Sequence, residues 1–291
     1  MAIDRAEALK KAEKLLRQGK LDGAIAEYVR LVEDQPKDWN SINALGDLYV
    51  RANQIENAVK QFTRIADHLH GEGFLPKAAA VYKKIIKIKP DDEHTLLQLA
   101  EIAAGQGVLV DAKTYYRQVA ERRQKKGDSF GAAQIVIKLG ELDPDDTDAK
   151  IQAARAAHGI NDTKRAVALL TEAADALEKK KRTADALAAM AEAVTLDPED
   201  APLRNRLLSG LIGQGQIAQA RGVARTSAEL ITIADVLEHE GRKAEALEVL
   251  TEAAQLDPED LSLRARLARE CVAVGNLEQA RVFLTPETAG D

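Results

Sequence analysis

The stretch that decides the fold is residues 58–92, which read AVKQFTRIADHLHGEGFLPKAAAVYKKIIKIKPDD. Its pattern of small residues and its closing proline return twice, each time 54 residues later. The shared positions form four columns: Ala58, Ala112 and Ala166; Ala66, Ala120 and Ala174; Ala78, Ala132 and Ala186; Pro90, Pro144 and Pro198. A fixed period of this size is typical of a solenoid, in which each repeat buries its apolar face only against its neighbours.

The composition predicts that these repeats are helical. Hydrophobic residues make up 45% of the chain and aromatic residues only 3%, so Ala and Leu supply most of the apolar surface. Apolar residues recur at spacings of three and four, as on one face of a helix, and no period-two alternation is present. We therefore predict an all-α fold, an α-solenoid or superhelix of helix pairs. Three long middle helices are expected near 55–70, 109–126 and 162–180.

The predicted organisation is a single α-solenoid over residues 1–291. Its parts are an N-terminal helix pair at 5–38, three-helix units at 39–92, 93–146 and 147–200, a longer variant at 201–260, a C-terminal pair at 261–284 and a tail at 285–291. In the variant the extra residues fall around 225–229, where we expect a helix to break or to lengthen. Proline ends each unit, and the aspartate two residues later is expected to cap the next helix.

Charge and cysteine content argue against several classes of protein. The net charge of −6 is mixed along the chain, whereas a dedicated nucleic-acid binder usually carries a basic face. The lone Cys271 excludes an intrachain disulfide, fits a reducing compartment and is expected in the core. Residues 1–20 predict neither a signal peptide nor a membrane anchor, and no stretch approaches the ~18 apolar residues of a transmembrane helix. We predict a cytoplasmic protein without nucleic-acid partner or membrane insertion.

Three segments carry a resemblance to a known family: Gly19…Ala24…Tyr28…Pro36, Leu45-Gly46…Tyr49…Ala58…Phe62 and Gly73…Ala78…Tyr82…Pro90. They resemble the tetratricopeptide repeat family, whose 34-residue unit is a helix pair with small residues at the crossing. The period here is atypical, because it is about 20 residues longer than the family's unit. The helix at 55–70 is therefore expected to serve twice, as the second helix of one pair and the first helix of the next.

The resemblance implies a non-catalytic protein–protein interaction scaffold or adaptor that binds a partner protein or peptide on the solenoid surface. Two alternatives stay open: a self-assembling structural subunit, hence a homo-oligomer, and the interaction region of a longer protein. No catalytic residue, cofactor or metal site is predicted. His68 and His70 are two apart on a helix and face different ways, and glycines 210, 213 and 215 follow no strand and indicate a turn.

Family members bind peptides on the face of their first helices, which implies a candidate site here. Its residues would be Trp39, Asn40, Asn43, Asp47, Arg51, Glu101 and Arg155. The alternative is that these are solvated polar helix faces. Trp39 is the only tryptophan, and it either packs between units or anchors a partner.

Two further features are candidate contact surfaces. Basic clusters contain Arg122, Arg123, Lys125, Lys126, Lys179, Lys180, Lys181 and Arg182, which would bind an acidic protein, or nucleic acid or a membrane surface, or else pair with acidic turns. Those turns would be 91–92 for the first cluster and 143–146 for the second. The C-terminal helix places Val282, Phe283 and Leu284 beside a polar tail. This apolar end is expected to pack on a second copy, a partner or a further segment, unless Phe283 folds back onto 261–274.

Overall fold

The computed structural model describes residues 4–284, and all regular elements in that range are α-helices. Contacts between Cα atoms divide the chain into two compact units, one ending at Ala156 and the other beginning at Ala157. α9 (Thr147–Gly159) contains the boundary. Each unit is described on its own, so the single solenoid over 1–291 and its division into units stay predictions, and the predicted tail at 285–291 lies outside the described residues.

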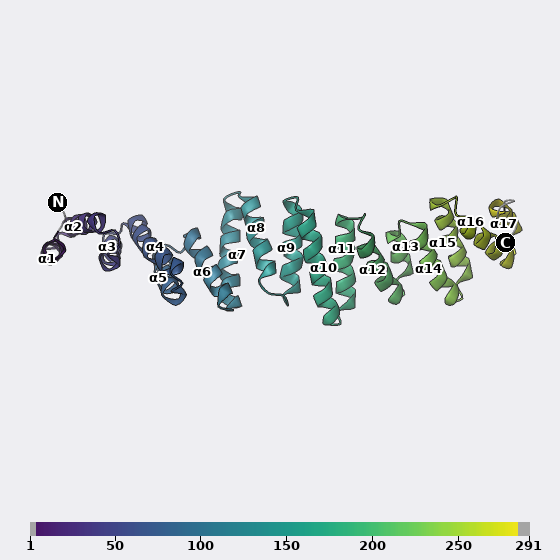
Figure 1. Cartoon of the computed structure of the whole chain (residues 1–291), viewed down its shortest axis with the longest axis horizontal. Helices are drawn as coiled ribbons and strands as arrows, with labels where there is room; N and C mark the ends of the chain where they lie inside the picture. The colour runs from purple at the N-terminus through teal and green to yellow at the C-terminus, as the bar shows by residue number, and fades with distance from the viewer. Residues whose placement is uncertain (1–3, 285–291) are drawn as a thin grey trace. The chain divides into compact units, whose positions relative to one another are not determined.

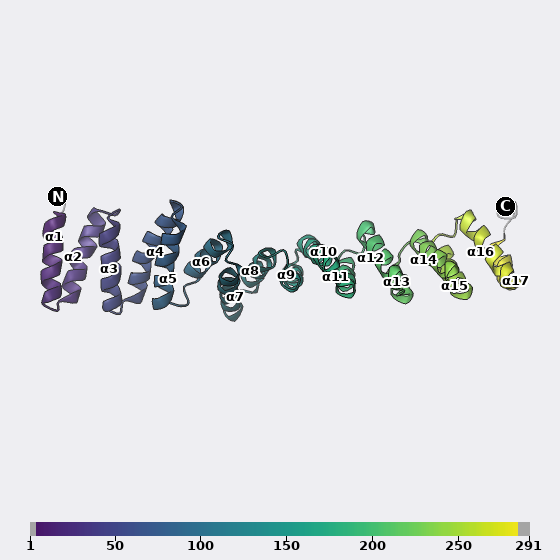
Figure 2. The ribbon, with the colours of Figure 1, turned by 90° about the horizontal axis from the view of Figure 1, so that it is seen from below.

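The first unit consists of successive helices, each packed on the next. They are α1 (Arg5–Arg17), α2 (Leu21–Asp34), α3 (Trp39–Arg51), α4 (Ile55–Gly71), α5 (Leu75–Ile88), α6 (Glu93–Gly105), α7 (Leu109–Lys125) and α8 (Ser129–Glu141). Figure 1 labels the helices, and Figure 2 shows α1, α2 and α3 side by side from a second direction.

The second unit continues with helices of the same kind. They are α10 (Thr163–Lys179), α11 (Thr183–Leu196), α12 (Ala201–Gly213), α13 (Ile217–Val223), α14 (Ser227–His239), α15 (Lys243–Leu256), α16 (Leu261–Ala273) and α17 (Leu277–Phe283). The three long helices expected from the sequence are confirmed as α4, α7 and α10, each of 17 residues. The break expected around 225–229 is also confirmed, because α13 ends at Val223 and Thr226 caps α14.

Two kinds of turn join most of the helices. The tight turns contain one residue with positive φ, a conformation that glycine adopts at least cost. These residues are Gly19, Asn53, Gly73, Gly107, Gly127, Asn161, Lys181, Gly215, Gly241 and Gly275. The proline turns instead end in an aspartate whose side chain accepts a hydrogen bond from the first turn of the next helix. Asp38, Asp92, Asp146, Asp200 and Asp260 all do so, which confirms the predicted caps.

α4 shows why the period is longer than a helix pair. It packs on both α3 and α5, so it buries two of its faces. Phe62 and Ala66 are fully buried there. At the crossing with α3, a Cβ atom added to Gly46 would lie only 2.5 Å from Phe62 Cε1. Small residues thus allow close helix packing, and the helix at 55–71 belongs to two pairs as the sequence predicts.

Candidate functional site

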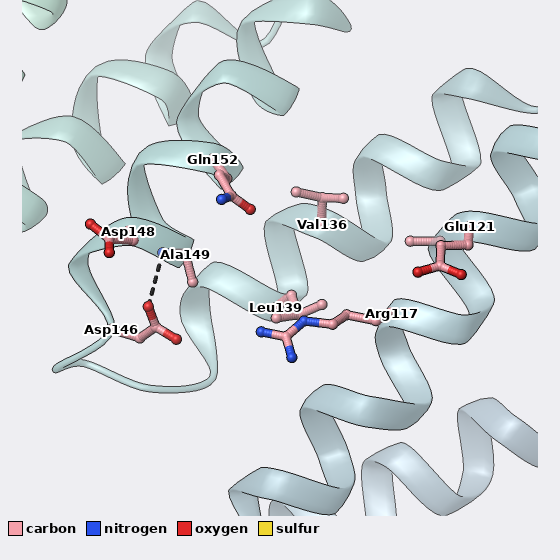
Figure 3. A pocket seen from close by; sticks show the side chains of 9 residues that line it. Arg117, Glu121, Val136, Leu139, Asp146, Asp148, Ala149 and Gln152 are labelled. Atoms are coloured by element: carbon pink, nitrogen blue, oxygen red, sulfur yellow. Dashed lines mark hydrogen bonds between the residues drawn. The ribbon is translucent and has the colours of Figure 1, made fainter.

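A feature of the first unit that could receive a ligand is a groove between α7, α8 and the beginning of α9. Its volume is about 490 Å³. The lining residues are Arg117, Ala120, Glu121, Val136, Leu139, Asp146, Asp148, Ala149 and Gln152. Figure 3 shows Val136 and Leu139 of α8 between Arg117 and Glu121 of α7 and the first turn of α9. An apolar floor with charged rims is the usual composition of a binding groove.

Close packing of α8 on α9 forms one wall of the groove. A Cβ atom added to Gly140 would lie 2.4 Å from Ala153 Cβ and 2.8 Å from the carbonyl oxygen of Ala149. Only glycine therefore permits this approach, since real Cβ contacts are longer. The residues that line the groove on α9 are held in place by this crossing.

The turn between α8 and α9 is fixed by one lysine. Lys113 Nζ on α7 donates to Asp143 Oδ2 at 2.7 Å and to Asp146 Oδ2 at 2.8 Å. Asp146 Oδ1 accepts from Ala149 N at 3.0 Å and caps α9. The hydrogen bonds from Lys113 lower the pKa of both aspartates and outweigh the opposite effect of burial. The rim of the groove at Asp146 therefore carries a fixed negative charge.

The preceding repeat fills the same place with a side chain. Tyr82 of α5 is fully buried, and its hydroxyl donates to Asp67 Oδ1 at 2.5 Å. His94 Nε2 lies 3.0 Å from the same oxygen, and the His94 ring meets the Tyr82 ring edge-on with centroids 6.3 Å apart. Burial raises the pKa of Tyr82, and the bond to Asp67 raises it further, so the phenol stays protonated.

One repeat later, the positions of these three residues hold different side chains. Val136 stands at the position of Tyr82, Glu121 at that of Asp67 and Asp148 at that of His94. The valine lacks the ring that occupies the space in the preceding repeat, and the groove opens there. Glu121 and Asp148 are both exposed at its rim.

Comparison with known proteins gives the family. Tetratricopeptide repeat models match residues 9–68, 167–200 and 237–286. The chain is a tetratricopeptide repeat protein. In general terms it is therefore a protein–protein interaction scaffold, of a family that is typically non-catalytic. No curated protein is significantly similar to this tetratricopeptide repeat protein in sequence.

Several solved structures resemble it distantly. A tetratricopeptide repeat protein from Parabacteroides merdae ATCC 43184 is 12% identical, with 95% of this chain and 98% of that chain covered and a TM-score of 0.32. The MamA 41-end structure from Desulfovibrio magneticus RS-1 is 16% identical, with coverage of 61% and 93% and a TM-score of 0.25. Another MamA structure is 15% identical, with coverage of 78% and 93% and a TM-score of 0.21.

A lysine of α5 contacts two residues of the predicted face of α3. Lys84 Nζ lies 2.6 Å from Asp47 Oδ1 and donates to Asn43 Oδ1 at 3.2 Å, above the ring of Phe62. Fifty-four residues later, Lys138 and Glu101 repeat this pair at 3.5 Å. After a further shift of 54 residues, the corresponding sequence positions hold Arg155 and Glu192, with the charges exchanged. Part of the predicted face is thus occupied by bonds within the protein.

The other residues of that face are less engaged. Trp39 is half-buried and stacks on His68, with ring centroids 4.2 Å apart, so it packs within the first unit. Asn40 and Arg51 are exposed. A role for these residues in partner binding stays a prediction.

The first basic cluster pairs with acidic residues near a turn. Arg123 Nε lies 2.7 Å from Glu93 Oε1, Lys126 lies 3.7 Å from Glu93, and Arg122 lies 3.9 Å from Asp91. This confirms the expected pairing with the turn at 91–92, and Glu93 is a further partner of the cluster. Lys125 is exposed.

The second cluster surrounds the turn between α10 and α11. Lys181 adopts a φ of 59° at this turn, and Arg182 lies 2.7 Å from Asp185. Lys179 and Lys180 are exposed. The expected pairing with 143–146 stays a prediction.

The remaining predictions concern the C-terminal helix, the core cysteine and the membrane. Val282 and Leu284 are exposed and Phe283 is half-buried, whereas Cys271 is buried as expected. Within residues 4–284, no helix combines the length and the apolar character needed to cross a bilayer. The same range contains no group of three or more potential metal ligands.

The groove itself was missed by reading the sequence. Its signal was available, because Tyr82, Val136 and Met190 form one column of the 54-residue alignment. A change from a large ring to a valine in one interior column indicates either compensation by a neighbour or an open space.

Proposed function

We propose that this tetratricopeptide repeat protein binds an extended segment of a partner protein in the groove between α7, α8 and α9. The observation that carries the proposal is that the same place is filled by Tyr82 one repeat earlier and is open at Val136. A side chain from a partner then takes the position that a side chain of the protein takes in the preceding repeat. Scaffolding, rather than catalysis, is the function proposed for the chain.

The groove suggests the chemistry of the ligand. Val136 and Leu139 offer an apolar floor that suits a ring. Glu121, in the place of Asp67, is positioned to accept a hydrogen bond from a phenol, as Asp67 does from Tyr82. Glu121 and Asp148 together favour a ligand with positive charge. We therefore expect a peptide with a tyrosine flanked by lysine or arginine.

Refilling the groove tests the proposal. The variant V136Y, and the triple variant E121D/V136Y/D148H, rebuild the arrangement of the preceding repeat. Fluorescent peptides selected by display on the wild-type protein, and synthetic peptides with tyrosine between lysines, serve as ligands in anisotropy titrations. We expect both variants to weaken binding at least tenfold, because their own ring occupies the space.

A matched control places the same ring outside the groove. Val110 lies on α7 and is 77% exposed, so V110Y adds a tyrosine to solvent. V110Y is expected to bind as the wild type does. If no tyrosine peptide binds, or if V136Y binds as tightly as V110Y, the groove is not the site.

Other predictions remain beside this one. The face that includes Trp39 and Asn40, the basic clusters as contacts for an acidic partner, and self-assembly as an alternative function are not tested by the described contacts. A cytoplasmic location also stays a prediction.

A further inference from the structure

Within the second unit, a stretch that ends with α12 and α13 is repeated 60 residues later, ending with α16 and α17. Three ion-paired residues show the register. Arg206 lies 2.6 Å from Asp175 and 2.8 Å from Glu178, and Arg266 lies 2.5 Å from Asp235 and 2.9 Å from Glu238. The bounds of α16 and α17 are also those of α12 and α13 plus 60. Residues of the two helix pairs are therefore compared position by position.

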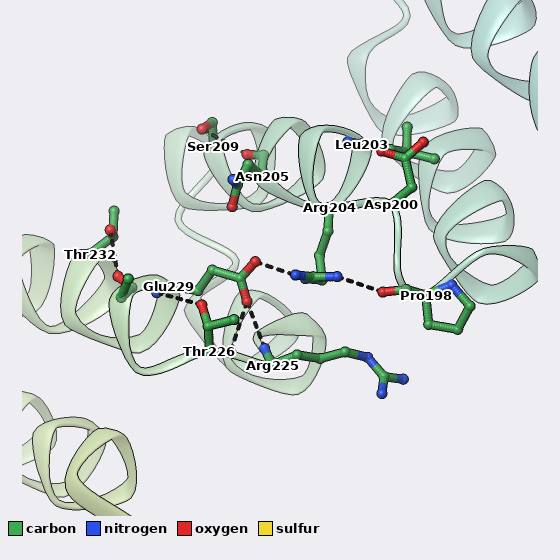
Figure 4. A network of polar contacts seen from close by, with 11 residues as sticks. Pro198, Asp200, Leu203, Arg204, Asn205, Ser209, Arg225, Thr226, Glu229 and Thr232 are labelled. Atoms are coloured by element: carbon green, nitrogen blue, oxygen red, sulfur yellow. Dashed lines mark hydrogen bonds and ion pairs between the residues drawn. The ribbon is translucent and has the colours of Figure 1, made fainter. Parts of the chain in front are cut away.

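Arg204 of α12 binds the helix pair that follows α13. Its Nε donates to Glu229 Oε1 at 2.7 Å, and both residues are almost fully buried, at 5% and 7% exposure. Glu229 is the third residue of α14 and forms a capping box with Thr226. Its second oxygen accepts from Arg225 N at 2.7 Å and Thr226 N at 3.0 Å. Figure 4 shows the arginine between this glutamate and the carbonyl of Pro198.

The pKa of Glu229 reflects the same contacts. Burial raises this pKa, but the hydrogen bonds from Arg225 N, Arg204 and Thr226 N outweigh burial and hold it below its usual range. The carboxylate therefore stays ionised opposite Arg204. A buried arginine in this position recognises a charged first turn of a helix.

α13 makes one more contact with the following pair, through Arg221, and its first residue is buried. Arg221 binds Glu252 of α15, with Nε 2.8 Å from Oε2, and lies 3.5 Å from Glu248. Ile217, at the beginning of α13, is only 7% exposed. A helix pair that is followed by another pair is thus characterised by Arg204 on its first helix and by Arg221 and a buried Ile217 on its second.

The corresponding positions on α16 and α17 have the same residue types, two arginines and one apolar residue. Among residues 4–284, however, no following helix pair binds them. Arg264 stands at the position of Arg204, and its Nε is buried without a hydrogen-bond partner in the part of the chain that the structure describes. Arg281 stands at the position of Arg221 and is 75% exposed, and among the described residues it pairs with Glu278 of its own helix, at 3.4 Å. Leu277, at the position of Ile217, is 58% exposed.

We propose that the surface formed by Arg264, Leu277 and Arg281 docks a helical hairpin of a partner protein. The first helix of that hairpin carries a glutamate three residues after a Ser or Thr N-cap, and its second helix carries glutamate facing Arg281. This chemistry follows from charge complementarity, because α14 and α15 present these groups to the equivalent arginines. A buried guanidinium nitrogen without an acceptor is costly, so an incoming carboxylate gains a strong interaction at Arg264.

The protein's own sequence supplies the probe. A synthetic fluorescent peptide of residues 224–260 contains α14 and α15 and hence the groups that Arg204 and Arg221 bind. Anisotropy titration against the full chain is expected to show binding that R264Q weakens at least tenfold. A peptide with E229Q is expected to bind the wild-type protein about as weakly as the unaltered peptide binds R264Q. Combining E229Q with R264Q should lower the affinity little further, which in a double-mutant cycle indicates that the two side chains interact directly.

Two further variants make the result decisive. R269Q removes an exposed arginine from the same helix and is expected to bind as the wild type does. L277D alters a residue that is already exposed, so it tests the surface even if R264Q unfolds; it too is expected to weaken binding. Absence of binding, or equal binding by R264Q and R269Q, overturns the proposal. So does a homodimer in light scattering that L277D dissociates, since a second copy would then cover this surface.

Discussion

Tyr82 and Val136 occupy the same position in successive repeats. The space around these two side chains differs far more between the repeats than the bounds of the surrounding helices do. Around Tyr82, Asp67 and His94 close over a filled interior. Around Val136, the corresponding positions line a groove of about 490 Å³. The bounds of α4 and α7 are identical after the shift of 54. The helix frame is thus set by turns and small residues, whereas the space available to a partner is set by one large side chain.

Removal of the ring from the filled repeat should have the largest effect. Tyr82→Val deletes a fully buried ring and its bond to Asp67, so we expect a loss of about 2–4 kcal/mol in the free energy of unfolding. Urea denaturation followed by circular dichroism measures it. Tyr82→Phe keeps the ring and loses only the hydroxyl, so it should cost about 1 kcal/mol. Equal costs for the two variants would show that the ring does not fill the interior.

A methyl group at the crossing of α8 and α9 should have the next largest effect. Gly140→Ala places Cβ against Ala153 and the carbonyl of Ala149, and we expect a loss of about 1–3 kcal/mol and weaker peptide binding in the groove. The filled repeat has Ile86 at this position, so the close approach is specific to the groove. Gly105→Ala is the control, because nothing lies within 4 Å of its added Cβ. A neutral Gly140→Ala would mean that α9 shifts without cost.

The acidic turn beside the groove should show the smallest effect, with a pH signature. Asp143 and Asp146 have a folded-state pKa below the ordinary 3.8, owing first to Lys113. At pH values between the folded-state and the unfolded-state pKa, the unfolded chain binds more protons than the folded chain. The two aspartates therefore contribute their full stabilisation of the folded state above about pH 4, and this stabilisation is lost as pH falls through their lowered pKa values. The filled repeat has Val59 in place of Lys113 and lacks this arrangement.

Lys113→Met removes the cause of the lowered pKa. We expect it to cost about 1 kcal/mol at neutral pH, and the difference from the wild type to shrink as pH falls below about 4. Urea denaturation across this range measures both. Lys138→Met, which removes a more exposed lysine of the neighbouring helix, is the control. A difference that does not change with pH would assign the cost of Lys113→Met to packing instead.

The helices could be predicted from the sequence because their boundaries are local. Proline turns, aspartate caps and the residues of the tight turns each act within a few positions, so α4, α7 and α10 were found nearly to the residue. Asn53, a residue type that tolerates positive φ, likewise lies in a tight turn. These features need no knowledge of the neighbouring repeat.

The site could not be predicted in the same way, since it depends on contacts between helices. Asp47 was expected on the face of α3 as a residue for partner binding, but Lys84 of α5 forms an ion pair with it. This contact depends on the packing of α3 and α5 on the same helix, α4. The groove likewise depends on which neighbour fills the space left by Val136. Neither fact follows from the period, because identical spacing accommodates a filled and an open interior.

Within each unit, the packing of successive helices on one another also determines how the unit folds. Contacts between residues close in sequence need only small loops, so their entropic cost is low and assembly is fast. Any hairpin can act as a nucleus from which order spreads along the chain in either direction. Such a unit can lose its outermost helices while its other helices stay native, and a partner bound to those outermost helices would then hold them against fraying.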